Sequence, residues 1–252
     1  MKEYTNGKTI ESNLQYLKLG YVKENYISMS DKAAKENWSY IQYLESLLEG
    51  EMQSKLDRSI KRRIKEAHFP QIKTIDQFQW SWPQKINQMQ IKNLFRHEFI
   101  SQKSNVIFLG GVGLGKTHLA ISLGYSACLK SLSVLFTTAI DIINNLSSAH
   151  NAGKLKYEMN KYLKPSLLIV DELGYIPIDK VGADFLFQVM SHRYERGSMI
   201  ITTNRAYKDR TAMFNNDAVL TSAILDRVIH HAESIVIEGK RYRMKDLINN
   251  SR

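Results

Sequence analysis

Cysteine and proline are scarce in this chain, and long apolar runs are missing. Its 252 residues include one cysteine, Cys128, which excludes an intrachain disulfide and a multi-cysteine zinc site. Residues 1–13 lack the apolar core of a secretion signal, and no apolar run has the length needed to cross a bilayer. We therefore expect a cytoplasmic protein that does not engage a membrane, with Cys128 as a small residue of the core.

Acidic residues are also few relative to basic ones. The chain has 35 Lys and Arg against 25 Asp and Glu, a formal net charge of +10. This excess suggests an anionic partner, with nucleic acid first, although a basic protein with no such partner is the alternative. With 43% hydrophobic residues, the chain is long enough for one large domain, or for one domain and a smaller one.

The most informative stretch is residues 105–119, NVIFLGGVGLGKTHL. The apolar run from Val106 to Leu109 predicts a strand that is buried on both faces. Residues 110–117 fit the pattern G-x-x-x-x-G-K-[ST], and residues 117–129 continue at helical spacing. The motif therefore has the strand, loop and helix context that phosphate binding requires.

Each position of this motif has a physical reason. Four glycines let the backbone turn its N–H groups around a phosphate, and the following helix adds the positive end of its dipole. Lys116 would reach the β and γ phosphates, and Thr117 would offer a hydroxyl to Mg²⁺. A glycine-rich turn that binds nothing is the alternative. The residues expected to hold ATP are Gly111, Val112, Gly113, Leu114, Gly115, Lys116, Thr117 and His118.

The N-terminal part, from about residue 14 to residue 67, has helical patterning and predicts a small helical domain. Leu14 opens a first helix, and Ser30 with Asp31 has the composition of the cap of a second. Residues 39–48 then carry an apolar face that should pack on another element.

A basic stretch follows on one predicted helix. Its positive residues present charge over about three turns, which is the footprint expected of contacts to the DNA backbone. A solvated helix face is the alternative. The residues that we expect to contact DNA are Arg58, Lys61, Arg62, Arg63 and Lys65.

Residues 70–83 look irregular and contain Phe78, Trp80 and Trp82. We expect them to form a connector packed on the next domain, with base stacking as the alternative. Residues 86–101 predict one helix. Helices and strands then alternate, and five strands in such an alternation predict an α/β fold with a mostly parallel sheet that is covered on both faces. The later strands are expected at 133–137, 167–171, 199–203 and 234–238, and the helices between them at 139–150, 154–163, 181–196 and 219–230.

Two of these strands end in polar residues that could act on a bound nucleotide. The apolar strand at 167–170 runs into Asp171 and Glu172, at the strand end where ligands bind in such sheets. Asp171 could hold Mg²⁺ together with Thr117, and Glu172 could deprotonate an attacking water, so hydrolysis is favoured over transfer. Asn204 could bond the γ phosphate if its strand lies beside the phosphate-loop strand. A plain turn residue is the alternative for Asn204.

Four segments together resemble the IstB-like ATPases, helpers of bacterial insertion-sequence transposases in the DnaA/DnaC branch of AAA+ proteins. They are GGVGLGKTHLA at 110–120, LLIVDELGY at 167–175, RYERGSMIITTN at 193–204 and ILDRVIHHA at 224–232. The resemblance covers nearly the whole chain. It implies a P-loop AAA+ ATPase that uses ATP and Mg²⁺, forms a homo-oligomer with ATP and has duplex DNA and a transposase as partners.

The resemblance also implies residue roles. Lys116 and Thr117 match the first nucleotide motif, Asp171 and Glu172 the second, and Asn204 the position called sensor 1. A separate residue, Arg227, matches the arginine finger by which one subunit completes its neighbour's site.

Alternatives stay open for the basic residues near the end of the chain. Arg227 could instead pair with Asp226 or Glu233. After the last strand, residues 239–252 are too few for a separate helical lid, which is a feature of the IstB-like group. Arg243 could contact nucleotide while its neighbours contact DNA, or this stretch could simply be solvated. The basic residues concerned are Lys240, Arg241 and Arg243.

The resulting prediction is a helical N-terminal domain at 1–68, a connector and leading helix at 69–104, and an AAA+ ATPase domain at 105–252 without a C-terminal lid. We expect an ATP-dependent helper of DNA transposition that assembles on duplex DNA without sequence preference. A DnaC-type helicase loader is the first alternative, and a metabolic P-loop kinase is the second.

Overall fold

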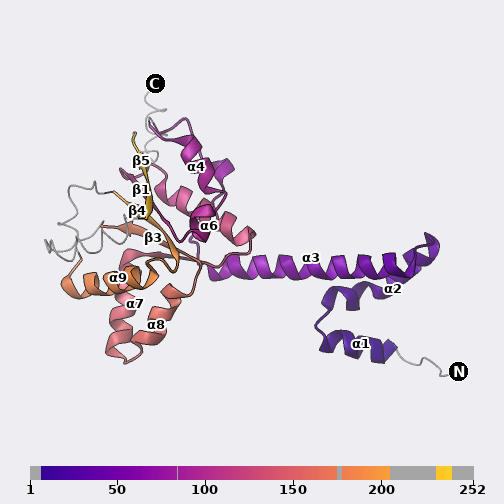
Figure 1. Cartoon of the computed structure of the whole chain (residues 1–252). Helices are drawn as coiled ribbons and strands as arrows, with labels where there is room; N and C mark the ends of the chain where they lie inside the picture. Colours follow the sequence, from indigo (N-terminus) through magenta and orange to yellow (C-terminus); the bar gives the residue numbers. More distant parts are fainter. Residues whose placement is uncertain (1–6, 84, 175–177, 205–230, 240–252) are drawn as a thin grey trace, which may run out of the picture. The chain divides into compact units, whose positions relative to one another are not determined.

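The computed structural model describes residues 7–83, 85–174, 178–204 and 231–239 (Figure 1). The chain divides into two compact units, Met1–Arg62 and Arg63–Arg252. The finer division expected from the sequence, at residues 68 and 104, stays a prediction. Among the described residues, no helix has both the length and the apolar character needed to span a membrane.

The first unit consists of helices, as predicted. They are α1 (Gly7–Tyr16), α2 (Gly20–Lys35) and the greater part of α3 (Tyr40–Glu66). The predicted helix start at Ser30 and Asp31 is wrong, because both residues lie inside α2. No side chain next to α2 caps it; instead the buried carboxylate of Glu51 on α3 accepts a hydrogen bond from the N–H of Val22 at 3.2 Å. A negative group at the first turn satisfies an orphan donor and complements the helix dipole.

Next to Glu51, the helices α2 and α3 approach each other closely. A Cβ on Gly50 would lie 2.0 Å from the ring of Tyr21, so the two helices can approach this closely only because position 50 has no side chain. On α3, Leu47 is buried. One turn earlier on the same helix, the hydroxyl of Tyr43 donates to the carbonyl of Tyr26 on α2 at 2.9 Å. These contacts fix one face of α3.

The second unit is built on a five-stranded sheet of order β2-β3-β4-β1-β5, and every pairing in it is parallel, as predicted. Its strands are β1 (Asn105–Gly110), β2 (Val134–Thr138), β3 (Leu167–Leu173), β4 (Ser198–Thr203) and β5 (Ala232–Ile237). The described helices are α4 (Gln88–Leu94), α5 (Glu98–Ser101), α6 (Lys116–Leu129), α7 (Ala139–Asn151), α8 (Leu155–Leu163), α9 (Lys180–Arg193) and the short 3-10 helix η1 (Ile75–Gln77).

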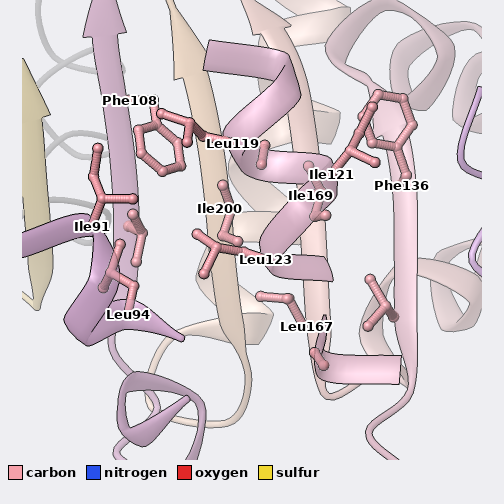
Figure 2. Packing of buried hydrophobic residues seen from close by; sticks show 14 of the residues in the cluster. Ile91, Leu94, Phe108, Leu119, Ile121, Leu123, Phe136, Leu167, Ile169 and Ile200 are labelled. Atoms are coloured by element: carbon pink, nitrogen blue, oxygen red, sulfur yellow. The ribbon is translucent and has the colours of Figure 1, made fainter. Parts of the chain in front are cut away.

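Successive residues of each central strand enter two different cores. On β3, Leu168 and Val170 pack with α7, α8 and α9 on one face, while Leu167 and Ile169 pack with α4 and α6 on the other. Figure 2 shows part of the second core, with Leu119 and Leu123 of α6 lying beside Phe108 of β1, Ile169 of β3 and Ile200 of β4. Burial on both faces explains why these strands are continuous apolar runs. Cys128 is fully buried in the second core, and its burial raises the pKa of the thiol to about 11.

The predicted single helix at 86–101 is wrong. Two short helices form instead: α4 ends at Leu94, and His97, whose φ of 66° is left-handed, is the residue directly before α5. The ring of His97 is buried, with Nε2 3.3 Å from the carbonyl oxygen of Leu123. Burial lowers the pKa of this imidazole. The break lets Phe99 and Ile100 enter the same core as α6.

At the edge of the sheet where the strands begin, one buried arginine joins two of them. Arg193 is 1% exposed, and its guanidinium donates to the carbonyls of Tyr162 at 2.8 Å, Pro165 at 3.0 Å and Ser198 at 2.8 Å. Burial lowers the pKa of Arg193 to about 10. The helix predicted to reach residue 196 ends at this residue, since its side chain is committed to the start of β3 and β4.

Candidate functional site

The loop after β1 is shaped by glycines at its two ends. A Cβ on Gly110 would lie 2.3 Å from the carbonyl oxygen of Ile237 on β5, so only glycine allows this approach. Gly113 and Gly115 have φ of 76° and 89°, and a Cβ on Gly115 would meet the ring of Phe78 at 2.6 Å. The loop therefore has the backbone form that the motif predicts, and α6 begins directly after it.

Lys116, the first residue of α6, turns back over this loop. Its side chain is buried, and Nζ donates to the carbonyl oxygens of Gly110 at 2.8 Å and Gly111 at 2.7 Å. Burial lowers the pKa of Lys116, while the negative charges of Asp171 and Glu172 act in the opposite direction. The ammonium group of Lys116, held against the backbone of the phosphate loop, is therefore placed to bind an anion in that loop.

The carboxylate of Asp171 is the centre of a hydroxyl network at the end of β3. Thr117 Oγ1 lies 3.0 and 3.1 Å from its two oxygens, and Thr202 Oγ1 on β4 lies 2.5 Å from Oδ1. Asp171 is 4% exposed, so its charge is stabilised by these donors and not by bulk water. The structure thus brings together Lys116, Thr117 and Asp171, which the sequence predicted to act as one site.

Glu172 differs from its neighbour in both exposure and backbone. Its side chain is exposed, and its φ of 61° is left-handed. The pairing of β3 with β4 shifts register between Val170 and Leu173, so the two acidic residues occupy a bulge. A bulge changes the direction of side chains. Here the side chain of Glu172 is exposed, while that of the adjacent Asp171 is buried.

Asn204 follows β4 directly and is exposed. The condition for its predicted role was that β4 should lie beside the phosphate-loop strand, and that condition is met: β4 pairs with β1, with Thr203 opposite Leu109. Asn204 therefore comes after the strand end that neighbours Gly110, where the loop starts.

The connector forms a second wall of the site. His118 Nε2 lies 2.9 Å from the carbonyl oxygen of Thr74, and the ring of Phe78 packs edge-on against the His118 ring, with centroids 5.5 Å apart. Burial lowers the pKa of His118. A cavity of about 280 Å³ lies between the connector and the start of α6. Its lining includes Ile72, Lys73, Gln77, Trp82, Leu114 and His118.

Sequence reasoning missed the site roles of Thr74, Phe78 and Thr202. The aromatic residues of the connector were a signal, since an apolar side chain in an irregular segment needs a surface to cover. The threonines had no signal in the sequence. The partner of Thr74, His118, lies 44 residues away, and the partner of Thr202, Asp171, lies 31 residues away.

The predicted cofactors can be tested against these residues. A loop of positive-φ glycines with a buried lysine matches a phosphate chain, and the oxygens of Thr117 and Asp171 are the ligand type that Mg²⁺ prefers. The donor set therefore fits ATP with Mg²⁺.

The basic candidates on α3 differ from one another. Lys61, Arg62 and Lys65 are exposed, and Arg63 is half-buried. Arg58 has a structural contact as well, since its Nη2 lies 3.3 Å from the buried carboxylate of Glu51. The other predicted site residues lie outside the described part of the chain: Arg227, Lys240, Arg241 and Arg243.

Comparisons with known proteins agree with the geometry. Residues 12–249 match the family model of the IstB-like ATP binding protein. The chain is 38% identical to an insertion sequence IS5376 putative ATP-binding protein of Geobacillus stearothermophilus, over 91% of each chain. It is 37% identical to an IS232 counterpart of Bacillus thuringiensis subsp. berliner, over 94% of each.

A similarity to a solved structure concerns the fold. The crystal structure of the DnaC helicase loader is 20% identical, with a TM-score of 0.53, over 66% of this chain and 96% of the other. At this identity the match identifies a shared P-loop AAA+ fold and leaves the partner open.

Proposed function

This chain belongs to the IstB-like ATP-binding protein family, and we propose that it is an ATP-dependent helper of DNA transposition. In this proposal it binds duplex DNA without sequence preference, assembles into a homo-oligomer with ATP and presents the DNA to a partner transposase. The observation that carries the proposal is the contact of Thr117 with Asp171 beside the buried Lys116, in a chain whose relatives are ATP-binding proteins of insertion sequences.

The described residues have separate roles in this mechanism. Lys116 would exchange the loop carbonyls for the β and γ phosphates, and Thr117 with Asp171 would hold Mg²⁺, directly or through water. When bound, the ion supplies charge neutralisation for the phosphoryl group. Glu172 would accept the proton of the attacking water, and Asn204 would orient that water.

The nucleoside end of ATP would lie in the cavity of about 280 Å³. Leu114 and His118 line this cavity from the phosphate-loop side, while Ile72 and Trp82 line it from the connector. Apolar and polar side chains share the lining of this cavity, so a nucleobase would have both a surface to pack on and groups to hydrogen-bond. The connector would thus take part in binding the nucleotide.

Hydrolysis would depend on assembly. An arginine donated by a neighbouring subunit stabilises the charge that develops on the transferring phosphoryl group, and we assign that role to Arg227. DNA would be bound mainly through phosphate contacts of the basic residues on α3, because no major-groove motif is evident in the sequence. We assign weaker candidate contacts to Lys240, Arg241 and Arg243.

A DnaC-type helicase loader is the second candidate, favoured by the fold shared with that loader. A metabolic P-loop kinase is a third, and Glu172 next to Asp171 counts against it. The decisive experiment measures binding to random duplex and to single-stranded DNA, with ATP, with ADP and with neither, and follows the size of the complexes by light scattering. Large ATP-dependent assemblies on duplex DNA support the transposition helper. Preference for single strands supports the loader, and no DNA binding in any state contradicts both.

A further inference from the structure

Thr202 on β4 contacts both acidic residues of the site although it is neither a P-loop residue nor one of the acidic pair. Its Oγ1 lies 2.5 Å from Oδ1 of Asp171, and the same oxygen accepts the backbone N–H of Glu172 at 3.0 Å. Thr202 is 1% exposed, so no bulk water competes for these contacts. One hydroxyl therefore connects the carboxylate of Asp171, the expected Mg²⁺ ligand, to the backbone of Glu172, the expected general base.

The Thr202 hydroxyl acts as a donor to one acidic residue and as an acceptor from the other. Its single proton can go only to one acceptor at a time, and the Asp171 carboxylate is an acceptor without a proton of its own when ionised. One of its two lone pairs receives the N–H of Glu172, a donor that the register shift between Val170 and Leu173 takes out of the regular ladder. Thr202 thus closes the bulge from the neighbouring strand.

Without this hydroxyl, the bulge would lose the contact that holds its unusual backbone. Glu172 has a φ of 61°, which a residue with a side chain adopts only where its surroundings impose it. The N–H of Glu172 and the buried carboxylate of Asp171 would each lose one hydrogen-bond partner. The backbone around Glu172 would then be able to relax toward ordinary strand geometry, and both carboxylates would change direction.

We propose that Thr202 is a positioning residue, which orients Asp171 for Mg²⁺ and Glu172 for the attacking water through one shared hydroxyl. This proposal rests on the proposed ATPase function. It assigns to β4 a part in metal binding that is separate from the role expected of Asn204 at the end of the same strand.

The test compares Thr202→Ser with Thr202→Ala, which both lose the methyl group and differ only in the hydroxyl. The measured quantity is the Mg²⁺ concentration that half-saturates the gain in affinity for a fluorescent, non-hydrolysable ATP analogue. We expect Thr202→Ala to need about 10- to 100-fold more Mg²⁺ than the wild type, in the range known for partners of metal ligands. Thr202→Ser should stay close to the wild type, and analogue binding in EDTA should be the same in all three proteins.

The control is Ser198→Ala at the other end of β4. Ser198 is also fully buried, and its hydroxyl donates to the carbonyl of Phe99 at 3.0 Å, far from the acidic pair along the strand. Its removal should lower the thermal midpoint without moving the Mg²⁺ requirement. Urea unfolding of every variant establishes that the folded protein is being compared.

Four results separate the possibilities. An unchanged Mg²⁺ requirement in Thr202→Ala, or an equal shift in Ser198→Ala, overturns the role of Thr202. Equal shifts in the Ser and Ala variants overturn it too, because the methyl group would then be the cause. A wild-type protein that binds the analogue without any Mg²⁺ dependence contradicts the proposed function itself, before any variant is considered.

Discussion

Thr117 Oγ1 lies 3.0 Å from Oδ1 of Asp171, although 54 residues separate the two in the sequence. The contact joins the first turn of α6 to the end of β3, so the phosphate loop and the acidic strand end form one site before any ligand is considered. Both oxygens are of the type that Mg²⁺ prefers, so the contact joins the two residues that we propose as its ligands.

Lys116→Ala tests the phosphate loop. Removing an ammonium that would donate to the β and γ phosphates should weaken ATP binding about 10- to 100-fold and abolish turnover, in line with the loss of a charged hydrogen bond. Calorimetric titration with ATP and Mg²⁺ measures the change. Lys92→Ala removes an exposed positive charge from α4 and should leave affinity unchanged. Unaltered affinity in Lys116→Ala would refute the assignment.

Glu172→Gln tests the general base. The amide cannot accept the proton of water, so hydrolysis should fall on the order of 10²- to 10⁴-fold while ATP still binds. Steady-state phosphate release and nucleotide titration separate the two effects. Glu195→Gln is a matched control, because Glu195 is also exposed with a left-handed φ, here 57°, but follows α9 away from the site. Brisk turnover in Glu172→Gln would remove this residue from the role.

Arg227→Ala tests whether neighbouring subunits complete each site. The variant should bind ATP normally and lose turnover by about 10³-fold, the size expected for an arginine supplied in trans. Mixing it with Lys116→Ala should restore part of the activity, since a Lys116→Ala subunit still carries Arg227 and can complete the intact site of an Arg227→Ala neighbour. Mixtures that stay as inactive as the separate variants would contradict donation in trans.

The double variant Lys61→Ala with Lys65→Ala tests the DNA contacts on α3. Each lysine bound to a phosphate releases counterions, so losing two should reduce the slope of log affinity against log salt by about 2, equally for different sequences. Fluorescence anisotropy on random duplexes at several salt concentrations measures the slope. The double variant Lys35→Ala with Lys92→Ala, at two exposed positions on other helices, is the control for net charge. Equal slopes in both double variants would argue against a specific role for α3.

Acidification should destabilise the protein through two histidines, one buried and one half-buried. Burial lowers the folded-state pKa of His97 and of His118 below the ordinary 6.5. Between these lowered values and about pH 6.5, the unfolded chain therefore binds more protons than the folded protein. Their contribution to stability is complete above about pH 6.5 and is lost as the pH falls through the lowered values. Urea unfolding at about pH 7.5 and at about pH 5.5 measures the loss. His97→Asn, which keeps a residue tolerant of the left-handed backbone, should show a smaller loss than the wild type; an equal loss would exclude His97 as a contributor.

Several features were predictable because they depend on neighbours in the sequence. The apolar run before Gly110 and the helical spacing after Lys116 are local signals, and both elements form as expected. The alternation of strands and helices requires crossover connections, which make a sheet parallel. The helix expected across 86–101 failed because the helix breaks between Leu94 and Glu98, where His97 is left-handed and its ring is buried, and neither feature has a local signature in the sequence.

The sequence by itself therefore determined the element types, the phosphate loop and the acidic pair, because hydrophobic period, glycine freedom and motif spacing act over a few residues. Only the tertiary structure decided which side chains support them. Thr202 reaches Asp171 across 31 residues, His118 reaches Thr74 across 44, and Glu51 caps α2 across 29. Such pairs arise when a parallel sheet or packed helices bring distant segments together, and a single hydrogen-bonding side chain leaves no periodic trace in the sequence by which its partner could be found.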